Sequence, residues 1–405
     1  MRQNFLLRLF GGRDAAPEHL VPESKASRTG ALIALQGQGR PAWSARDPAT
    51  LAREGFMKNA IVYRAVTMIA EAAASVPLLA YAGDAERPDH PLLALLARPN
   101  ARQSGGDWLA GLYGNLLVSG NAYAELVLLG GSPAELHALR PDRMKVVPGP
   151  DGWPEAYEYT VAGRSVRFPV EDGLSPILHL RTYHPLDDHY GFAPLEAAAI
   201  ALDLHNAAGS WNKALLDNAA RPSGALVYKG EGGASLSQEQ FERLKRELEA
   251  NYSGAVNAGR PLLLEGGLDW TSMALTPHDM DFMEAKNGAA REIALAFGVP
   301  PMLLGIPGDN TYANYAEANR VFWRQTVLPL VGRTAEAIAA WLGPHFPGAL
   351  RLGFDTDAVD ALSTERAALW ARVGTADFLS RDEKRQAVGY GVGRALEEGE
   401  EGWTT

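Results

Sequence analysis

Residues 259–314 read GRPLLLEGGLDWTSMALTPHDMDFMEAKNGAAREIALAFGVPPMLLGIPGDNTYAN, and this stretch decides the fold. Two short apolar runs around a Gly-Gly turn predict a pair of strands, after which the apolar period becomes that of a helix. Thr276, Pro277 and Asp279 supply a cap, a first-position proline and a carboxylate at the positive helix end. The GVPP sequence ends this helix near residue 297, and a small polar loop leads into the next one. The predicted buried stripe consists of Phe282, Ala285, Ala289, Ile293 and Ala296.

The bulk composition indicates a globular chain of two or three domains. It has 405 residues, of which 46% are hydrophobic, and this is enough to bury a real core. Its net charge of −10 argues against a protein that grips duplex DNA, but a channel that lets DNA slide should also avoid many Lys/Arg–phosphate contacts. The absence of cysteine excludes disulfides, thiolate metal sites and cysteine nucleophiles.

The N-terminal segment, residues 1–55, is rich in Gly, Pro, Ser, Arg and Ala and has weak periodicity, which predicts a flexible arm. Its first ten residues form an amphipathic run that is too short to span a bilayer. We interpret this run as a segment that becomes ordered against a partner subunit, in preference to a membrane anchor. No later apolar run reaches the ~18 residues of a membrane span. We therefore expect a soluble protein that is not secreted.

Residues 56–185 predict one α+β unit. A helix begins near Asn59 and ends at Val76-Pro77, and a second amphipathic helix, residues 107–118, stops at Ser119-Gly120. A short strand at residues 78–81 and a short helix at residues 90–96 lie between them. Alternating apolar residues then predict further strands. These strands cover residues 122–129, 135–139, 144–147, 157–161, 165–168 and 177–180.

Two long helices are expected to enclose a small insert. The first runs from Pro194 to about Ala219, about 26 residues or ~39 Å, and the second covers residues 277–297. In the insert, Ser237 and Gln240 match a capping box, and Leu236 with Phe241 matches a hydrophobic staple, so a highly charged helix should begin there. Further strands are predicted at residues 225–228, 261–264 and 268–273.

A third long helix should follow, from residue 311 to about residue 342, with Pro329 in its interior. An interior proline removes one backbone hydrogen bond and is expected to kink the axis. The last 50 residues predict one or two short helices, at 364–373 and 380–388, and an acidic, loose tail from Glu397.

The chain contains no phosphate-binding loop, zinc-binding HExxH helix or GxSxG nucleophile elbow, and we assign it no catalytic, metal or cofactor site. One alternative stays open. His184, Asp187, Asp188 and His189 lie within six residues, so a small-molecule hydrolase using the His184–His189 loop would be a monomer or dimer that chelation inactivates. Hydrogen bonding and helix capping explain the same residues more simply.

Two polar segments are candidate binding surfaces. The loop between the second and third long helices is small and uncharged apart from one aspartate, which suits a protrusion into a channel. The helix from residue 238 to 250 carries mixed charge, which suits protein contacts better than DNA. The candidate channel residues are Gly308, Asp309, Asn310, Thr311, Tyr312 and Asn314, and the candidate docking residues are Glu239, Glu242, Arg243 and Arg246.

Several segments, in this order, resemble the portal proteins of tailed bacteriophages and gene transfer agents. The pair Phe192-Ala193 departs from the family, in which a Gly/Ser-type pair is commoner, and the C-terminal region is short. The resembling segments are GNAYA at 120–124 with EL at 135–136 and LRP at 139–141, ILHLR at 177–181 with YGFAPL at 190–195, NAGRP at 257–261 with LEGGLDW at 264–270, FGVPPMLLG at 297–305, and TYAN at 311–314.

The resemblance implies an α+β portal fold with a small helical crown, assembled as a ring of normally twelve subunits at one capsid vertex. Twelve copies at −10 each carry a formal charge of about −120, so repulsion between the channel wall and DNA phosphates is expected. Whether the particle is a phage or a gene transfer agent, and the exact ring number, stay open. The implied divisions are an arm at 1–55, a wing at 56–192, stem helices at 193–222 and 276–300, a clip at 223–275, a tunnel loop with kinked helix at 301–349, and a crown with acidic tail at 350–405.

The resemblance also implies the partners. The portal would be a channel for packaging and ejecting double-stranded DNA without sequence specificity, and it would not be an enzyme. The clip would contact the terminase large subunit and later the head–tail adaptor, and the wing would contact the major capsid protein. No membrane or cofactor is implied. The protein would be found in the virion or phage-like particle, and in the bacterial cytoplasm during assembly.

Overall fold

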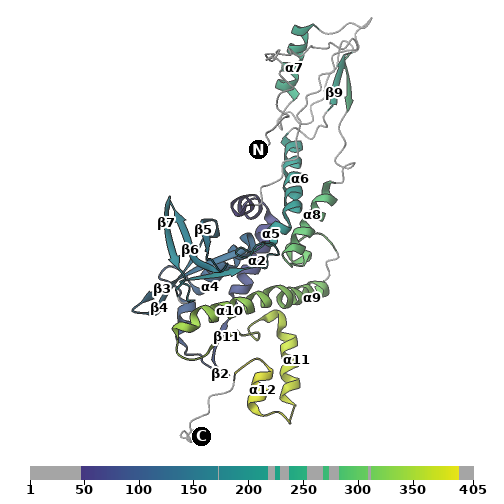
Figure 1. Cartoon of the computed structure of the whole chain (residues 1–405). Coiled ribbons are helices and arrows are strands. Elements are labelled where there is room, and N and C mark those ends of the chain that lie inside the picture. Colours follow the sequence, from purple (N-terminus) through teal and green to yellow (C-terminus); the bar gives the residue numbers. More distant parts are fainter. Residues whose placement is uncertain are drawn as a thin grey trace, which may run out of the picture.

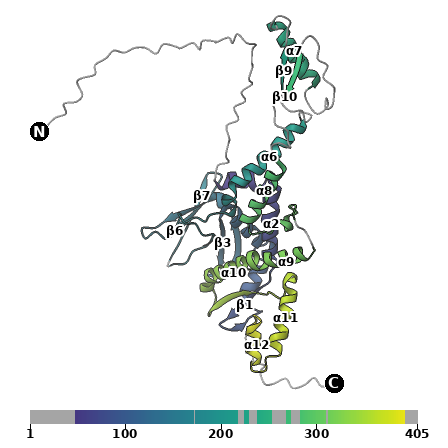
Figure 2. The ribbon, with the colours of Figure 1, turned by 90° about the vertical axis from the view of Figure 1, so that its right-hand side faces the viewer.

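The computed structural model describes residues 47–171, 173–217, 224–228, 237–252, 268–272, 282–308 and 312–391. The molecule is elongated (Figures 1 and 2). A body of helices and sheets, residues 47–193 with the helix α10 (Leu328–Leu342), lies near the middle. Two long helices leave the body on one side and lead toward a small distal module. A C-terminal helical unit lies on the opposite side.

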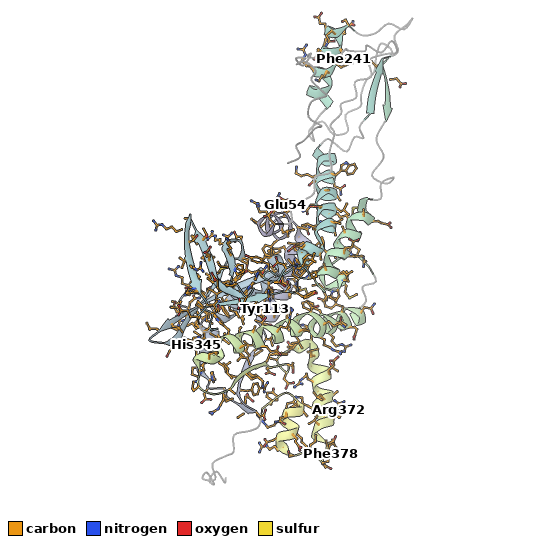
Figure 3. The ribbon with its side chains drawn as sticks, viewed as in Figure 1. Glu54, Tyr113, Phe241, His345, Arg372 and Phe378 are labelled. Atoms are coloured by element: carbon orange, nitrogen blue, oxygen red, sulfur yellow. The ribbon has the colours of Figure 1, made fainter. Side chains whose placement is uncertain are left out.

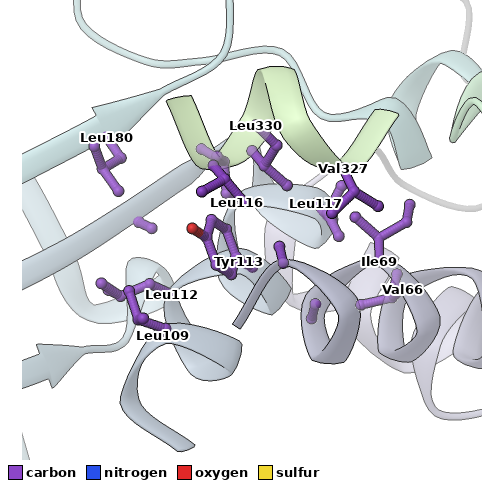
Figure 4. Packing of buried hydrophobic residues seen from close by; sticks show 14 of the residues in the cluster. Val66, Ile69, Leu109, Leu112, Tyr113, Leu116, Leu117, Leu180, Val327 and Leu330 are labelled. Atoms are coloured by element: carbon purple, nitrogen blue, oxygen red, sulfur yellow. The ribbon is translucent and has the colours of Figure 1, made fainter. Parts of the chain in front are cut away.

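The core of the body forms where α2 (Ala60–Ala74), α4 (Gly105–Ser119) and α10 pack together (Figure 4). Asn59 caps α2, because its side-chain oxygen accepts hydrogen bonds from the backbone of the first turn. Gly120 ends α4 in the left-handed conformation, with φ at 72°. The predicted helices are confirmed, although α4 begins two residues before the predicted start. Buried residues of the core include Val66, Ile69, Leu112, Tyr113, Leu116, Val327 and Leu330.

The N-terminal boundary of the folded chain differs from the prediction. Residues assigned to the flexible arm form α1 (Pro48–Leu51) and a π-helical turn η1 (Ala52–Phe56). Leu51 is fully buried in the core of the body, and the side chain of Asn206 donates to the backbone oxygen of Glu54. Tertiary contacts therefore fix a segment whose own composition favours an irregular chain. The rest of the predicted arm, residues 1–46, lies outside the described residues.

Two antiparallel sheets lie beside the core of the body. The first has the order β4-β3-β8, and in it Tyr123 lies opposite Leu139 on one side and His179 on the other. The second has the order β5-β6-β7 and extends away from the helices (Figure 1). Every predicted strand of this region is confirmed, although several begin one to three residues earlier. The strands are β3 (Asn121–Leu129), β4 (Ser132–Leu139), β5 (Met144–Pro148), β6 (Pro154–Val161), β7 (Arg164–Pro169) and β8 (Ile177–Arg181), and η2 (Pro141–Arg143) precedes β5.

A third sheet joins the two ends of the described chain. Its order is β11-β1-β2, and β1 (Leu78–Ala82) pairs antiparallel with β11 (Leu350–Phe354) along its whole length. The strand β11 was not predicted, because pairing with a strand about 270 residues earlier in the chain leaves no local pattern. The predicted division puts β1 in the unit 56–192 and β11 in the unit 350–405. The two strands in fact belong to one sheet. The short elements here are β2 (Ala85–Glu86) and α3 (Pro91–Ala97).

The helix pair consists of α6 (Ala199–Asp217) and α8 (Phe282–Ala296), which pack side by side (Figure 1). The predicted continuous helix from Pro194 is interrupted. A short helix α5 (Pro194–Ala197) comes first, and Ala198 leaves the helical conformation with ψ at 4°. Alanine is the best helix former, so only packing against the body, where Ala198 is buried, accounts for this break. The predicted cap at 276–281 lies outside the described residues.

The predicted buried stripe of α8 is correct only in its second half. Ala289 and Ile293 are buried, whereas Ala285 is exposed to solvent. The side chain of Phe282 lies outside the described residues. The helix therefore contacts the body only near its C-terminal end.

The third long helix contains a π-helical turn in place of a sharp kink. After η5 (Pro301–Leu304), α9 (Tyr312–Phe322) passes through η6 (Trp323–Val327) directly into α10. Pro329 has no backbone N–H, and the widened turn immediately before it accommodates the missing hydrogen bond. α9 and α10 follow nearly the same line in both views (Figures 1 and 2).

The C-terminal unit, residues 355–391, contains two helices in the places predicted. These are α11 (Ser363–Gly374) and α12 (Arg381–Ala387), preceded by η7 (Gly343–His345) and η8 (Asp360–Leu362). Ser380 and Glu383 form a reciprocal capping box at the start of α12. The tail from Glu397 lies outside the described residues.

The distal module lies beyond the ends of α6 and α8 that point away from the body (Figure 3, near Phe241). It consists of β9 (Gly224–Tyr228) and β10 (Leu268–Ser272), which pair antiparallel, and of α7 (Gln238–Tyr252). The predicted strands at 225–228 and 268–273 are confirmed, whereas the one at 261–264 lies outside the described residues. None of the helices described here is both long and apolar enough to cross a membrane.

Candidate functional site

The proline-rich turn after α8 is firmly anchored to the body. Phe297, Val299 and Leu303 are buried in the main core, and Ile306 packs in a small cluster with Ala290 and Ala294. Gly298 has a φ of 67°, and the hydroxyl of Thr326 donates to its backbone oxygen at 2.6 Å. The turn therefore holds the chain that follows it in a fixed position.

The candidate channel loop begins where this anchored turn ends. Pro307 and Gly308 are exposed, and the guanidinium of Arg291 on α8 donates to the backbone oxygen of Pro307. Asp309, Asn310 and Thr311 lie outside the described residues. The chain re-enters as α9 at Tyr312, whose side chain is also outside them, and Asn314 is exposed. The structure therefore places both ends of the predicted loop at the surface.

Two arginines on and just after α9 are paired with opposite charges, whereas Arg291 beside the loop donates to a backbone oxygen. Arg320 on α9 forms an ion pair with Glu317 one turn earlier, and Arg324 lies 3.5 Å from Glu365 on α11. These pairs offset the positive charges of the last turn of α9 and of η6. Such a surface would not hold phosphate groups tightly, because tight nonspecific binding needs several unpaired Lys or Arg side chains.

The four candidate docking residues lie together on α7. Glu239, Glu242, Arg243 and Arg246 are spaced at three and four residues, so they share one helix face, and all four are exposed. The capping box at the start of this helix is confirmed, because Gln240 N donates to Ser237 Oγ at 3.3 Å and Ser237 N donates to Gln240 Oε1 at 2.9 Å. Leu236, the other half of the predicted staple, lies outside the described residues.

The loop of the hydrolase alternative serves to hold backbone. Asp187 Oδ1 accepts hydrogen bonds from the backbone of His189 at 2.7 Å and of Tyr190 at 2.9 Å. Desolvation is the largest single influence and raises the pKa of the Asp187 carboxyl, but these two hydrogen bonds and the nearby His184 and His189 together outweigh it and lower the pKa. Among the described residues, no three His, Asp or Glu side chains are grouped so that they could hold a metal ion. Nothing in the loop supports hydrolysis.

The segment 120–124 and the segment 177–195 are bonded to one another, which the sequence did not reveal. Asn121 Oδ1 lies 3.0 Å from His179 Nε2 and accepts from Gly191 N at 2.8 Å. A side chain at Gly191 would overlap the backbone of Gly120, so glycine is required at this crossing. This junction fixes the chain just before α5, and it therefore helps to set the direction in which the helix pair leaves the body.

The ring of Tyr123 stacks on His179, with centroids 4.3 Å apart. Burial, together with the charges of Arg181 and His189, lowers the pKa of His179 to about 3. The imidazole is therefore neutral at physiological pH, and its Nε2–H donates to Asn121. The only signal in the sequence was that both segments resemble the same family.

A polar cluster in the C-terminal unit was also missed. Asp357 accepts hydrogen bonds from Arg366, from Trp370 Nε1 at 3.1 Å and from Tyr390 Oη at 2.9 Å. The hydrogen bond from Arg366 is the main reason that the pKa of Asp357 is below its usual value. These residues are distant in sequence and follow no known spacing, so only the folded chain brings them together.

Comparison with known proteins identifies the family. The family model for phage portal proteins matches residues 60–389. The chain is 55% identical to a chain in the neck of a native gene transfer agent particle computed with C12 symmetry, covering 88% of this chain and 97% of that one, with a TM-score of 0.66. An uncharacterized protein of Rickettsia bellii is 43% identical over 83% of this chain and 88% of its own length.

A probable portal protein of Streptomyces phage phiC31 is also similar, being 27% identical over 87% of this chain and 82% of its own length. The family match extends from the start of α2 to the end of the C-terminal unit, so it includes the anchored turn, the helix pair and the distal module. The fold, and a family match that covers most of its length, lead to one conclusion: the chain belongs to the phage portal protein family.

Proposed function

We propose that twelve copies of this chain form a ring at one vertex of a phage-like particle, and that double-stranded DNA passes through the ring. The observation that carries this proposal is the 55% identity to a chain in a gene transfer agent neck computed with C12 symmetry, of which this chain covers 97%. In this role the protein is a structural channel and not an enzyme. It belongs to the particle once assembled and to the bacterial cytoplasm during assembly.

Each part of the elongated molecule has a role in this proposal. The body would be the wing that contacts the major capsid protein, and the helix pair would be the stem. The distal module would be the clip, and the C-terminal unit with the tail would be the crown. Because β11 pairs with β1, we place the crown after residue 354 and not at residue 350. No membrane, metal or cofactor takes part.

The loop between η5 and α9 would reach the narrowest part of the channel. We assign this role to Gly308, Asp309, Asn310, Thr311, Tyr312 and Asn314. The anchored turn supports the assignment, because buried side chains continue as far as Ile306, and Pro307, Gly308 and Asn314 on either side of the loop are exposed. Uncharged polar groups would touch DNA without binding its phosphates tightly.

The face of α7 that carries Glu239, Glu242, Arg243 and Arg246 would dock the terminase large subunit during packaging and the head–tail adaptor afterwards. Its exposed, mixed charge supports protein contacts, which such charge pairs orient. The position of α7 at the extreme end of the molecule supports the same role (Figure 3).

Asn310→Lys tests the channel assignment. A lysine in each of twelve loops would place a ring of positive charge around the DNA, so packaging velocity in a motor assay should fall several-fold, more so at low salt. Ser132→Lys, an exposed residue on β4 in the body, is the matched control and should leave the velocity unchanged. Equal velocities for both variants would remove this loop from the channel.

We further propose that the particle is a gene transfer agent and not an infective phage, since the similarity to the gene transfer agent chain is far greater than that to the phage portal. Sequencing of the DNA inside purified particles decides this point. Fragments drawn from the whole host genome are the expected result, and one repeated genome that encodes the particle would contradict it.

A further inference from the structure

One face of α6 is apolar, and none of the described residues of its own chain covers it. Ile200 and Leu204 are 55% and 52% exposed, and Ala207 is exposed as well. Their spacing of four and three residues puts them on one stripe of the helix. Leu202, on the opposite side of α6, is fully buried, and Ala208 marks the edge where the stripe meets the packed side. The helix therefore has a second apolar face that points away from the body.

The outward face of α8 offers space for such a stripe. Ala285 and Leu295 are exposed on it, Leu295 to 79%. Gly288 lies between them, and a Cβ built there would meet nothing within 4 Å. A glycine inside a helix is about 1 kcal/mol less favourable than alanine, and the fold of the single chain gives no reason for it. A close approach by another chain is a reason.

The stripe of α6 and the gap at Gly288 lie at similar heights along the helix pair. The helices α6 and α8 pack side by side, and burial first and the charge of Lys286 on α8 second lower the pKa of His205 on α6, so we take these two residues to mark one level of the pair. The helices run in opposite directions (Figure 1). Leu204 is next to His205, and Gly288 is two residues from Lys286, so both lie near this level of the helix pair. If the ring axis runs along the helices, rotation from one copy to the next does not shift residues along the axis, and Leu204 of one copy can meet Gly288 of the next.

Charges beside the two faces are complementary. Asp203 borders the stripe of α6, and Arg291 lies one turn from Gly288 on the outward face of α8. A closed ring of more than two subunits needs two different, complementary faces on each copy. The helix pair carries both faces, one on each helix.

We propose that the stripe Ile200–Leu204–Ala207 of one copy packs on the outward face of α8 of the next copy, with Leu204 entering the space at Gly288. This inference rests on the proposed ring and names its seam. The contact would account for two features that the single chain does not explain. Leu204 would be buried by the next copy, and Gly288 would leave room for it. The occupant of the stripe is thus a second copy of this chain.

Cysteine cross-linking tests the seam, because the full chain contains no cysteine. Leu204→Cys protein and Gly288→Cys protein are prepared separately, mixed, assembled and treated with a short bismaleimide. A covalent heterodimer should form with at least tenfold higher yield than in a mixture of Leu129→Cys and Gly288→Cys proteins. Leu129 is 78% exposed on β3, away from the helix pair, and is the matched control.

Gly288→Leu adds a readout that a purely structural role would not change. A leucine fills open space in the single chain, so the thermal midpoint of unfolding should not fall. It also fills the site that Leu204 of the next copy would occupy, so the ring fraction in native mass spectrometry should drop at least fivefold.

The outcomes separate the seam from the ring. If wild-type rings form but the heterodimer yield equals the control, the seam is wrong and the ring stands. If the wild type forms no ring in the assembled particle, the proposed function fails. The side chain of Asn206 on α6 donates to the backbone oxygen of Glu54, so the first described residues of the chain lie near α6. If deleting residues 1–46 speeds maleimide labelling of Leu204→Cys monomers, the arm covers the stripe and the proposal is overturned.

Discussion

The body and the C-terminal unit are held together by different forces. In the body, α2, α4 and α10 bury a continuous apolar cluster that includes Trp108, Leu112 and Ile338. In the C-terminal unit, Val373 is the buried residue of α11, and α12 buries none. Arg366, Trp370 and Tyr390 gather instead around the single carboxylate of Asp357.

The body and the C-terminal unit should therefore be destabilised by different kinds of substitution. Apolar burial is proportional to area and is insensitive to pH, whereas a carboxylate cluster depends on the charge of one group. Arg385 and Glu86 add a link between α12 and β2, with a nitrogen–oxygen distance of 3.4 Å. The following changes test whether the body depends on volume and the C-terminal unit on charge.

Leu112→Ala should have the largest effect, because Leu112 is fully buried between the helices of the body. The loss of transfer free energy and the cavity left behind should lower the free energy of unfolding by about 3 kcal/mol. Chemical denaturation of the monomer measures this. Leu129→Ala, at a leucine that is 78% exposed, should change it by less than about 0.5 kcal/mol. Similar losses for the two variants would refute the packing account.

Acid should act on the body through the buried imidazole of His179. The pKa of His179 is about 3 in the folded chain and about 6.5 when unfolded, so below pH 6.5 the unfolded chain binds the extra proton. Between pH 6.5 and 5, this linkage should lower the free energy of unfolding by on the order of 2 kcal/mol.

His179→Gln should remove that slope, since glutamine does not titrate but can still donate to Asn121. Denaturant titrations at several pH values measure it, with His137→Gln, at a histidine whose side chain is 41% exposed, as the control. An unchanged slope in His179→Gln would show that other groups cause the acid sensitivity.

Asp357→Asn should loosen the C-terminal unit alone. Removing the charge weakens the hydrogen bonds from Arg366, Trp370 and Tyr390, so amide exchange in α11 and α12 should speed up roughly tenfold, or about 1.4 kcal/mol. Exchange in α4 should not change. Asp360→Asn, at an exposed carboxylate three residues away, is the control.

The acid effect has the same sign in the two parts, because acid destabilises both, but it falls in a different pH window. The folded pKa of Asp357 is below its ordinary value of 3.8, so its contribution is present above that value and is lost as the pH falls through the lowered pKa. In the wild type, the body should therefore weaken at a higher pH than the C-terminal unit. The reverse order in a pH series of amide exchange would break the comparison.

Charge reversal on α7 should have the smallest effect on stability. Glu239→Lys with Glu242→Lys alters exposed side chains, so the free energy of unfolding should change by less than about 0.5 kcal/mol. Binding of the purified adaptor or terminase large subunit should nevertheless weaken, as isothermal titration calorimetry would show. If both partners bind the variant as tightly as the wild type, this face of α7 is not the docking surface.

Local patterns predicted most of the secondary structure. Asn59 and Ser380 predicted helix starts, Gly120 predicted a helix end, and the alternation of apolar residues predicted the strands of the body. These signals depend only on residues that are close in sequence. The break at Ala198, the π-helical turn before Pro329 and the strand β11 were missed or altered. All three are decided by packing against distant segments.

The candidate sites divide in the same way. The charged face of α7 follows from spacing alone, whereas the crossing of Gly191 over Gly120 and the bond from His179 to Asn121 join segments 58 to 71 residues apart. The assignment of the channel loop remains a prediction, since Asp309, Asn310 and Thr311 lie outside the described residues.

By itself, the order of residues determined the helices, the capped starts, the small residues of the long helices and the resemblance to portals. These features depend on interactions between residues that are close in sequence. Such interactions are present in a short segment whatever the rest of the chain does. Tertiary structure alone decided that β1 would pair with β11, that Asp357 would gather three distant side chains, and that Leu204 would face outward. Such contacts depend on how the whole chain closes on itself, which no local window of sequence contains.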